Sequence, residues 1–158
     1  MENEEVKDLA VKEENSVTDF SQVSGNSKVE VETLSNIKDS KEMFNLSNHA
    51  DTRINECIGE KIRMKKVLIN KYYKPLKEPV VDEETGEIIK DTEMSVSCVI
   101  VDDNGKSYAT GSKTFTFDLI KYLSTYGGAK DLDKGIEIKI IQKSIKNSPN
   151  KALTFEVI

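Results

Sequence analysis

Residues that build most catalytic and metal sites are scarce in this sequence. Its 158 residues include one histidine, two cysteines and no tryptophan. His49 would have to serve any histidine-containing triad or metal site, and no serine or cysteine nucleophile pattern accompanies it. Cys57 and Cys98 are too far apart for a disulfide framework or a paired-cysteine metal site, so we expect two reduced, packed thiols. The sequence predicts a protein that is not an enzyme and needs no cofactor or metal.

Long apolar segments are also absent. No run approaches the roughly 18 residues that a membrane span needs. The chain starts with acidic residues, whereas a signal peptide starts with basic ones. We therefore expect a cytoplasmic protein without membrane contact. Its length and its 37% hydrophobic content fit one core of ordinary size.

Charge is distributed unevenly along the chain. Residues 1–50 hold 11 Asp and Glu against 5 Lys and Arg, whereas residues 51–158 hold 17 against 18. The first part therefore carries −6 and the second +1, so the acidic total describes a mixture of two regions. Residues 1–38 lack a sustained apolar period. We expect a disordered acidic tail over 1–38 and a single folded domain over 39–158.

Two short helical segments are expected at the start of this domain. Ser40 is a candidate cap for a helix through Met43, Phe44 and Leu46. A second helical turn would place Ile54 and Ile58 on one side, since they are four residues apart.

Strand periodicity follows. Ile62 and Met64 alternate with basic residues, and the apolar phase then shifts to Val67 and Ile69, which predicts a β-bulge near residues 65–66. A loop is expected from Pro75 through residues 82–87, before a strand over residues 94–101. The dipeptide at residues 104–105, Asn-Gly, predicts a type I′ hairpin into a strand over residues 106–111.

The period then changes to that of a helix and back. Thr116 is a candidate cap for a helix with Phe115, Leu119, Leu123 and Tyr126 on its apolar side, ended by glycines at 127–128. Alternation returns at residues 136–140, and a turn at 147–150 leads to a last strand over 153–157. The predicted order is β-β-β-α-β-β, typical of a mainly β protein with a five-stranded OB-fold-like barrel. A ubiquitin-like or other small α+β sheet is the alternative, because periodicity does not show closure.

Four segments also resemble a known family. They are Phe-Asn-Leu-Ser-Asn-His-Ala-Asp at 44–51, Val-Asp-Glu-Glu-Thr-Gly-Glu at 81–87, Asp-Asn-Gly-Lys-Ser-Tyr at 103–108 and Leu-Thr-Phe-Glu-Val-Ile at 153–158. Over residues 40–158 the chain resembles single-stranded DNA-binding proteins of phages and mobile elements of Gram-positive bacteria. The resemblance implies a small, OB-like, non-enzymatic protein. The sequence departs from the pattern in its acidic N-terminal tail and in ending at Ile158 without an acidic tip.

The residues themselves point to the same chemistry in one stretch. Residues 61–77 contain seven cations and no acid, with two adjacent tyrosines inside. Cations that follow phosphates and aromatic faces that stack on bases are what unspecific single-strand binding requires. We expect Tyr73 on the DNA and Tyr72 in the core, since neighbours on a strand face opposite ways. The candidate DNA contacts in this stretch are Lys61, Arg63, Lys65, Lys71, Tyr72, Tyr73 and Lys74. A solvated basic strand with both tyrosines packed is the alternative.

Further candidate contacts lie beside two turns. Lys106 and Tyr108 follow the Asn-Gly dipeptide, and Lys139, Lys143, Lys146 and Lys151 surround the last hairpin, which corresponds to a ligand-binding loop of an OB barrel. Each lysine taken alone is more typical of ordinary surface charge. The carboxylates at residues 82–87 are expected to form a solvated hairpin tip, and those at 102–103 to belong to a turn.

The sequence therefore predicts a non-catalytic protein that coats and protects single-stranded DNA during replication or recombination of phage or mobile-element DNA. Its partners would be the DNA strand and replication or recombination proteins. The alternative is an OB-like adaptor that binds a replication protein without DNA affinity of its own, and a nuclease that uses the loop carboxylates is a third hypothesis. The acidic tail is expected to compete with DNA for the basic groove.

Overall fold

The computed structural model describes residues 29–158, and the chain forms two compact units. One unit contains residues 29–30 and 73–93, and the other contains residues 31–72 and 94–158. We refer to residues 73–93 as the arm and to residues 31–72 and 94–158 as the core unit. The arm is described by itself.

The protein is mainly β, as predicted. Its strands form one mixed sheet in the order β2-β5-β4-β3-β6-β7, with β1 paired to β3. β2 runs parallel to β5, and the pairs β4–β5, β3–β6 and β6–β7 are antiparallel. The sheet is not closed, because its two end strands, β2 and β7, do not pair with each other. The strands are β1 (Glu30–Ser35), β2 (Thr52–Arg53), β3 (Lys61–Val81), β4 (Ile88–Asp102), β5 (Ser107–Thr110), β6 (Ile136–Ser144) and β7 (Lys151–Val157).

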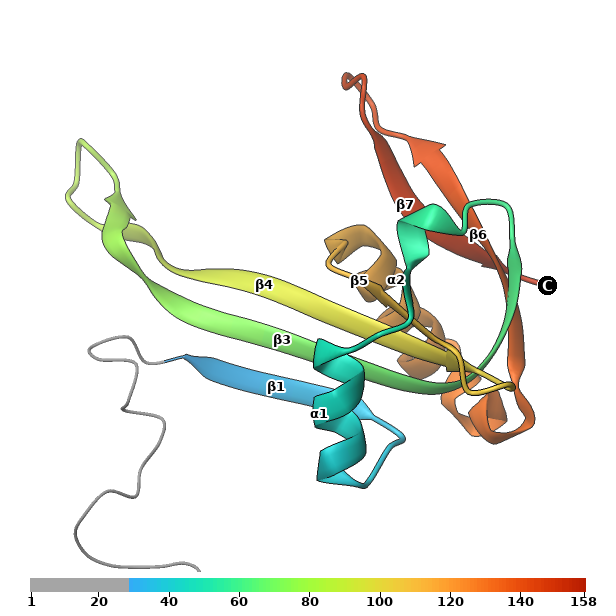
Figure 1. The fold of residues 1–158 in the computed structure, drawn as a ribbon. Helices are drawn as coiled ribbons and strands as arrows, with labels where there is room; N and C mark the ends of the chain where they lie inside the picture. The colour runs from blue at the N-terminus through green and yellow to red at the C-terminus, as the bar shows by residue number, and fades with distance from the viewer. Residues whose placement is uncertain (1–28) are drawn as a thin grey trace, which may run out of the picture. The chain divides into compact units, whose positions relative to one another are not determined.

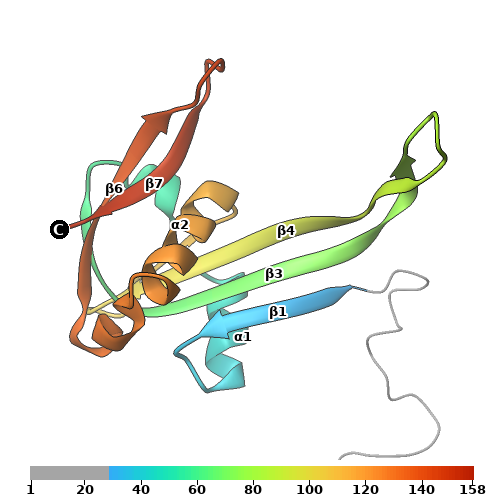
Figure 2. The ribbon, with the colours of Figure 1, turned by 180° about the vertical axis from the view of Figure 1, so that it is seen from behind.

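From β3 onward the elements follow the predicted order, with a helix between the third and the fourth strand of that series. This helix is α2 (Lys113–Ser124), and a shorter helix, α1 (Ser40–Asn48), precedes β2. Figures 1 and 2 show β1, β3 and β4 side by side, and β6 and β7 form a hairpin that joins the sheet through the start of β3. Residues 29–158 also contain two 3₁₀ helices, η2 (Ile54–Glu56) and η3 (Gly128–Lys134).

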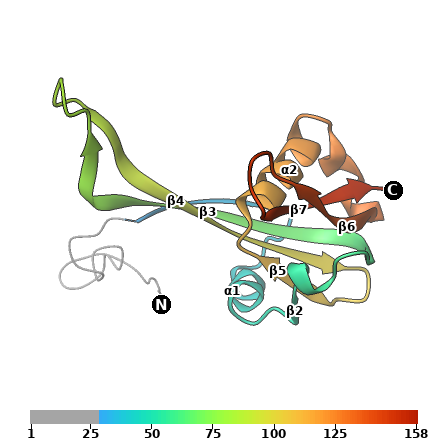
Figure 3. The same cartoon turned by 90° about the horizontal axis from the view of Figure 1, so that it is seen from above.

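Strand alternation gives the core unit two apolar clusters on opposite faces of β3 and β4. Val67 and Ile69 of β3 belong to the larger cluster, which contains Phe115 and Leu119 of α2. Leu68, between them, packs with Val99 and Ile37 in the smaller cluster, against which α1 lies. Figure 3 shows the two helices on either side of these strands.

The bulge expected in β3 agrees with this packing. Ile62, Met64, Val67 and Ile69 all belong to the larger cluster, so the inward phase shifts between residues 64 and 67. The shift falls where the sequence predicted it.

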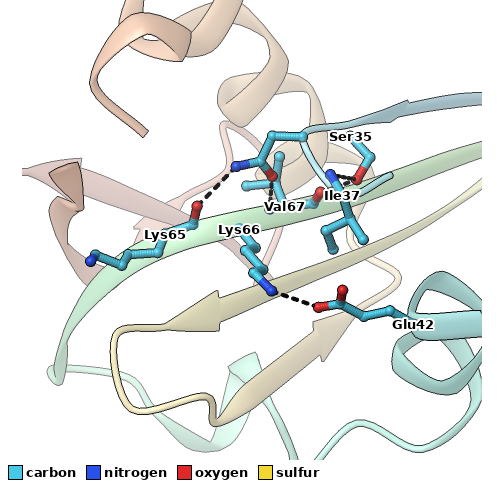
Figure 4. Close-up of polar contacts among 7 residues, drawn as sticks. Ser35, Ile37, Glu42, Lys65, Lys66 and Val67 are labelled. Atoms are coloured by element: carbon cyan, nitrogen blue, oxygen red, sulfur yellow. Dashed lines mark hydrogen bonds and ion pairs between the residues drawn. The ribbon is translucent and has the colours of Figure 1, made fainter. Parts of the chain in front are cut away.

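The predicted boundary of the tail at residue 38 is wrong for its last ten residues. β1 pairs with β3, and Ile37 is buried in the smaller cluster. Polar contacts also join the end of β1 to β3. The Ser35 hydroxyl donates to the carbonyl oxygen of Val67 at 2.6 Å. The side chain of Asn36 accepts from the Val67 amide and donates to the Lys65 carbonyl (Figure 4). Residues 1–28, which carry the rest of the expected tail, lie outside the described residues.

The expected loop over residues 75–87 is also wrong, since β3 continues to Val81 and β4 begins at Ile88. Only residues 82–87 form a turn. Pro75 and Pro79 suggested a loop because proline donates no hydrogen bond to a ladder. In a two-stranded ribbon each strand has one unpaired edge. Pro75 and Pro79 are four residues apart, so both nitrogens can face the unpaired edge of β3, where no ladder hydrogen bond is lost.

The connection between β4 and β5 is a hairpin, as expected, but of another type. A type I′ turn needs positive φ at both central residues. Gly105 has φ of +85°, but Asn147 is the only non-glycine residue in the described part of the chain with positive φ. The Asp102 carboxylate instead accepts from the amides of Asn104 and Lys106, both at 2.9 Å. Asp102 therefore organises the turn.

The predicted helices exist, but their caps differ. Asp39 rather than Ser40 caps α1 by accepting from the Lys41 amide, and Ser112 rather than Thr116 caps α2 by accepting from the Phe115 amide. Thr116 is buried one turn further on, where its hydroxyl donates to the Ser112 carbonyl at 2.7 Å. The second helical turn is η2; it buries Ile54, but Ile58 is exposed.

Both cysteines are free and buried, as expected. Burial raises the pKa of the Cys98 thiol to about 12. None of the helices in residues 29–158 has the length and apolar character of a membrane-spanning segment.

Candidate nucleic-acid interface

A groove of the core unit opens where β5 and the β6–β7 hairpin face each other without pairing. Its deeper part is a hollow of about 500 Å³ whose walls include Thr110 at the end of β5 and Leu153 of β7. A shallower hollow of about 280 Å³ shares Arg53, Thr110 and Gly111 with it and continues to Val96 on β4. We refer to the two hollows together as the groove.

The groove combines positive charge with neutral polar groups. Arg53 and Lys151 are the charged residues on its walls, and no Asp or Glu lines either hollow. Asn55, Ser112, Thr114 and Gln142 add uncharged donors and acceptors. Such a surface attracts anions, because cations without neighbouring carboxylates leave a net positive potential.

Arg53 reaches the groove because a short parallel pairing holds its strand. Arg53 of β2 pairs with Ala109 of β5. Asp51, just before β2, accepts from both the amide and the hydroxyl of Ser107 at 2.9 and 3.1 Å, and the Ser107 hydroxyl accepts from the Asp51 amide at 2.9 Å. The hydrogen bonds from the Ser107 amide and then its hydroxyl hold the pKa of the Asp51 carboxyl below its usual value. Asp51 is therefore a positioning residue for Arg53.

The start of α2 forms another part of the wall. The Thr110 hydroxyl accepts from the Ser112 amide at 3.0 Å, and the Ser112 hydroxyl accepts from the Phe115 amide at 3.1 Å. Ser112 and Thr114, which flank the first residue of α2, both line the groove. The positive end of the helix dipole adds to the charge of Arg53 and Lys151.

The basic residues at the start of β3 lie on another surface. Lys61 is opposite Lys139 of β6, but Lys139 is in turn opposite Glu156 of β7. Arg63 is opposite Glu137, and its guanidinium donates to the Lys134 carbonyl at 2.6 Å. This face therefore brings Lys61 and Lys139 together but interleaves them with carboxylates.

The next cations of β3 differ in their contacts. Lys65 points away from its neighbours in Figure 4, whereas Lys66 forms an ion pair with Glu42 of α1 at 2.7 Å. Lys71 is 17% exposed, forms an ion pair with Glu32 of β1 at 3.4 Å and lies 5.5 Å from the ring centre of Phe117. Lys71 therefore joins β1 and α2 within the core unit.

The two adjacent tyrosines are both half-buried. Tyr72 belongs to the core unit, whereas Tyr73 and the exposed Lys74 belong to the arm. The assignment of Tyr73 to DNA and of Tyr72 to the core stays a prediction.

Tyr108 is a core residue. Its side chain is 5% exposed, and its hydroxyl donates to the Asp102 carboxylate at 2.9 Å. Burial, followed by the Asp102 interaction, raises the pKa of Tyr108. Lys106 is exposed, and its ammonium group lies 5.4 Å from the centre of the Tyr108 ring. The ring itself is buried and therefore has no open face for a base.

The lysines around the last hairpin lie in different surroundings. Lys143 is 3.9 Å from Asp118 of α2, and Lys146 is exposed in the turn between β6 and β7. Only Lys151, among the residues proposed from the sequence, lines the groove. Arg53 was missed, because a two-residue strand paired in parallel leaves no periodic signal in the sequence.

Other types of site have little support in the described residues. Residues 29–158 contain no group of three or more His, Cys, Asp or Glu side chains placed to hold a metal ion. The carboxylates expected at a hairpin tip are there, since Asp82 accepts from the amides of Glu84 and Thr85 at 2.7 and 3.2 Å.

Comparisons with known proteins found no match. No family model, curated protein or solved structure matches the chain.

Proposed function

We propose that the protein binds single-stranded DNA through the groove of the core unit and is not an enzyme. The observation that carries this proposal is that Arg53 and Lys151 both line the groove, whose walls carry no carboxylate. A single strand offers one phosphate per nucleotide, and cations along a groove follow such a backbone.

The fold and the resemblance support the same reading. The order from β3 to β7, with α2 between the third and fourth strands, is that of an OB fold, whose barrel is partly open and binds oligonucleotides. We propose an OB-like fold for the core unit, with the open side between β5 and β7 as its ligand site. The resemblance to phage and mobile-element proteins adds the role, which is coating of DNA strands exposed in replication or recombination.

Binding would proceed by charge and polar contacts more than by base stacking. Neither hollow has an aromatic residue on its walls, and the apolar part of the groove is provided by Val96, Ala109, Ile145, Ala152 and Leu153. Phosphates would lie on Arg53 and Lys151, and bases would lie against the apolar side chains and the amides of Asn55 and Gln142. Such contacts read no particular base, so little sequence preference is expected.

A gel shift with purified full-length protein and labelled oligo-dT tests this proposal. We expect a shift with oligo-dT that is weaker with duplex of the same length, because the duplex cannot place one strand in the groove. An RNA oligomer in a third lane reports on DNA preference. Lack of any shift at micromolar protein and low salt would reject the proposal in favour of the adaptor, and metal-dependent loss of the oligomer would favour a nuclease.

A further inference from the structure

Most of the arm is a two-stranded ribbon with a defined register. It consists of residues 76–81 of β3 and residues 88–93 of β4, joined by the turn at 82–87. The Asp82 amide donates to the Glu87 carbonyl at 2.8 Å, which places Val81 opposite Ile88 and Val80 opposite Ile89. Residues opposite each other share a face of the ribbon, and each strand alternates between the two faces.

This register separates the charges of the arm by sign. One face, here called the basic face, holds cations and no carboxylate: Lys77, Pro79, Val81, Ile88, Lys90 and Thr92. The other, the acidic face, holds carboxylates and no cation: Leu76, Glu78, Val80, Ile89, Asp91 and Glu93. Each face carries its charges beside an apolar pair.

The apolar pairs on both faces are exposed. Val81 and Ile88 are 48% and 61% exposed on the basic face, and Val80 and Ile89 are 48% and 66% exposed on the acidic face. Within residues 29–158, no ion pair involves the charged residues of either face. A two-stranded hairpin alone is marginally stable in water, and adjoining exposed apolar side chains rimmed by charge mark an interaction surface.

We propose that the partner of this surface is the arm of a second copy of the chain, with the basic face of one arm stacked on the acidic face of the other. Stacked ribbons lie about 10 Å apart, close enough for long side chains at the edges to meet. Val81 and Ile88 of one copy would cover Val80 and Ile89 of the next. Lys77 and Lys90 would then lie against Glu78 and Asp91.

Charge selects this pairing over the two symmetric ones. Stacking two basic faces or two acidic faces would bring like charges together, which is unfavourable. The contact between unlike faces is heterologous, so each copy keeps one basic and one acidic face for further copies and the series is open-ended. The turn supports docking because Asp82 fixes its backbone before contact, which lowers the entropy lost on binding. The proposal does not depend on DNA binding.

Sedimentation velocity of the full-length protein without DNA, over a range of concentrations at low salt, tests this proposal with two charge-reversed variants. The first carries Lys77→Glu and Lys90→Glu, which makes both faces acidic. The second carries Glu78→Lys and Asp91→Lys, which gives both faces a net positive charge, because Glu93 is then the only carboxylate on either face. We expect the wild type to form a concentration-dependent series and each variant alone to associate at least ~10-fold more weakly. An equimolar mixture of the two variants should regain association, since unlike faces meet again.

Control variants each reverse one charge on an exposed residue of the core unit. Lys130→Glu is the control for the first variant and Asp133→Lys for the second, and both should associate like the wild type. Circular dichroism melts verify that each variant is folded. A wild type that stays monomeric throughout overturns the proposal, as does association that the arm variants leave unchanged. Loss of association in both variants without recovery in the mixture would also overturn it, because it excludes contact between the two faces.

Discussion

Tyr108 lies in the core, because the alternation of side chains along β5 turns it inward and not toward a binding surface. Its place after a turn and beside Lys106 suggested a stacking platform, but the ring points into the larger cluster. Its hydroxyl is held by Asp102, the residue that also organises the turn through its other carboxylate oxygen. The tyrosine therefore fixes the β4–β5 hairpin that leads to the groove.

Replacing Tyr108 by phenylalanine tests this role. The change removes the hydroxyl and leaves the Asp102 carboxylate without one of its donors, which should cost about 1–2 kcal/mol of the free energy of unfolding. Affinity for oligo-dT should stay within experimental error of the wild type. Urea unfolding and fluorescence anisotropy measure the two quantities. A stable Tyr108→Phe variant with weakened DNA binding would show that the hydroxyl contacts DNA instead.

Asp51 gives a pH dependence whose sign follows from its contacts. Because hydrogen bonds from Ser107 lower the pKa of Asp51 in the folded protein, its contribution to stability is present above the usual value of 3.8 and is lost as pH falls through the folded pKa. We expect Asp51→Asn to be less stable than the wild type at neutral pH and the difference to shrink in acid. Thermal melts of both proteins from neutral to acidic pH check this. A difference that is constant with pH would mean that the carboxylate charge is not involved.

At the scale of elements, β1 shows that sequence composition can hide a strand. Its six residues are all exposed, and the segment shares the polar composition of residues 1–28. Its pairing with β3 and the burial of Ile37 just after it are tertiary features. Strand β1 is therefore ordered by its neighbour rather than by a periodicity of its own.

Two shortened chains isolate the contribution of this segment. One lacks residues 1–28 and the other lacks residues 1–38, so they differ only by residues 29–38. The shorter chain should be less stable by about 2–5 kcal/mol, because it loses the burial of Ile37 and the hydrogen bonds of Ser35 and Asn36 to β3. Urea unfolding of both chains measures the difference. Equal stability would show that β1 contributes nothing to the fold.

Elements with a strong internal signal were predictable, and elements set by long-range contacts were not. The helical spacing of Phe115 and Leu119 predicted α2, and alternation predicted β6 and β7. The arm was mistaken for a loop because prolines and an acidic turn dominate its sequence, although an edge strand tolerates both. In the groove, Lys151 was foreseen from its turn, whereas Arg53 depends on the clamp between Asp51 and Ser107, which are 56 residues apart.

At the scale of the whole molecule, charge is unequal between residues 1–28 and residues 29–158. Residues 1–28 hold 7 Asp and Glu against 3 Lys, a net of −4, which leaves −1 for residues 29–158 of the total −5. An acidic segment tethered to the chain is held near a cationic groove at roughly millimolar effective concentration. Such a segment would compete with the phosphates of a DNA strand.

Removal of residues 1–28 should therefore tighten binding to oligo-dT at low salt, and the affinities should converge as salt screens the contacts. Fluorescence anisotropy across a salt series measures both chains. A full-length variant in which the acids of residues 1–28 are replaced by their amides is the matched control and should behave like the shortened chain. Equal affinities of all three proteins at every salt concentration would remove competition by this segment.

The groove itself is tested most directly by the salt dependence of binding in two double variants. Arg53→Ala with Lys151→Ala removes both cations of the groove, and Lys61→Ala with Lys139→Ala removes the same charge from the face shared by β3 and β6. Each phosphate contact on a single strand contributes about 0.7 to the slope of log affinity against log salt. The account predicts that the groove variant loses about 1.4 of this slope together with affinity, while the other variant keeps the wild-type slope. The reverse result, or an unchanged slope in the groove variant, would contradict DNA binding in the groove.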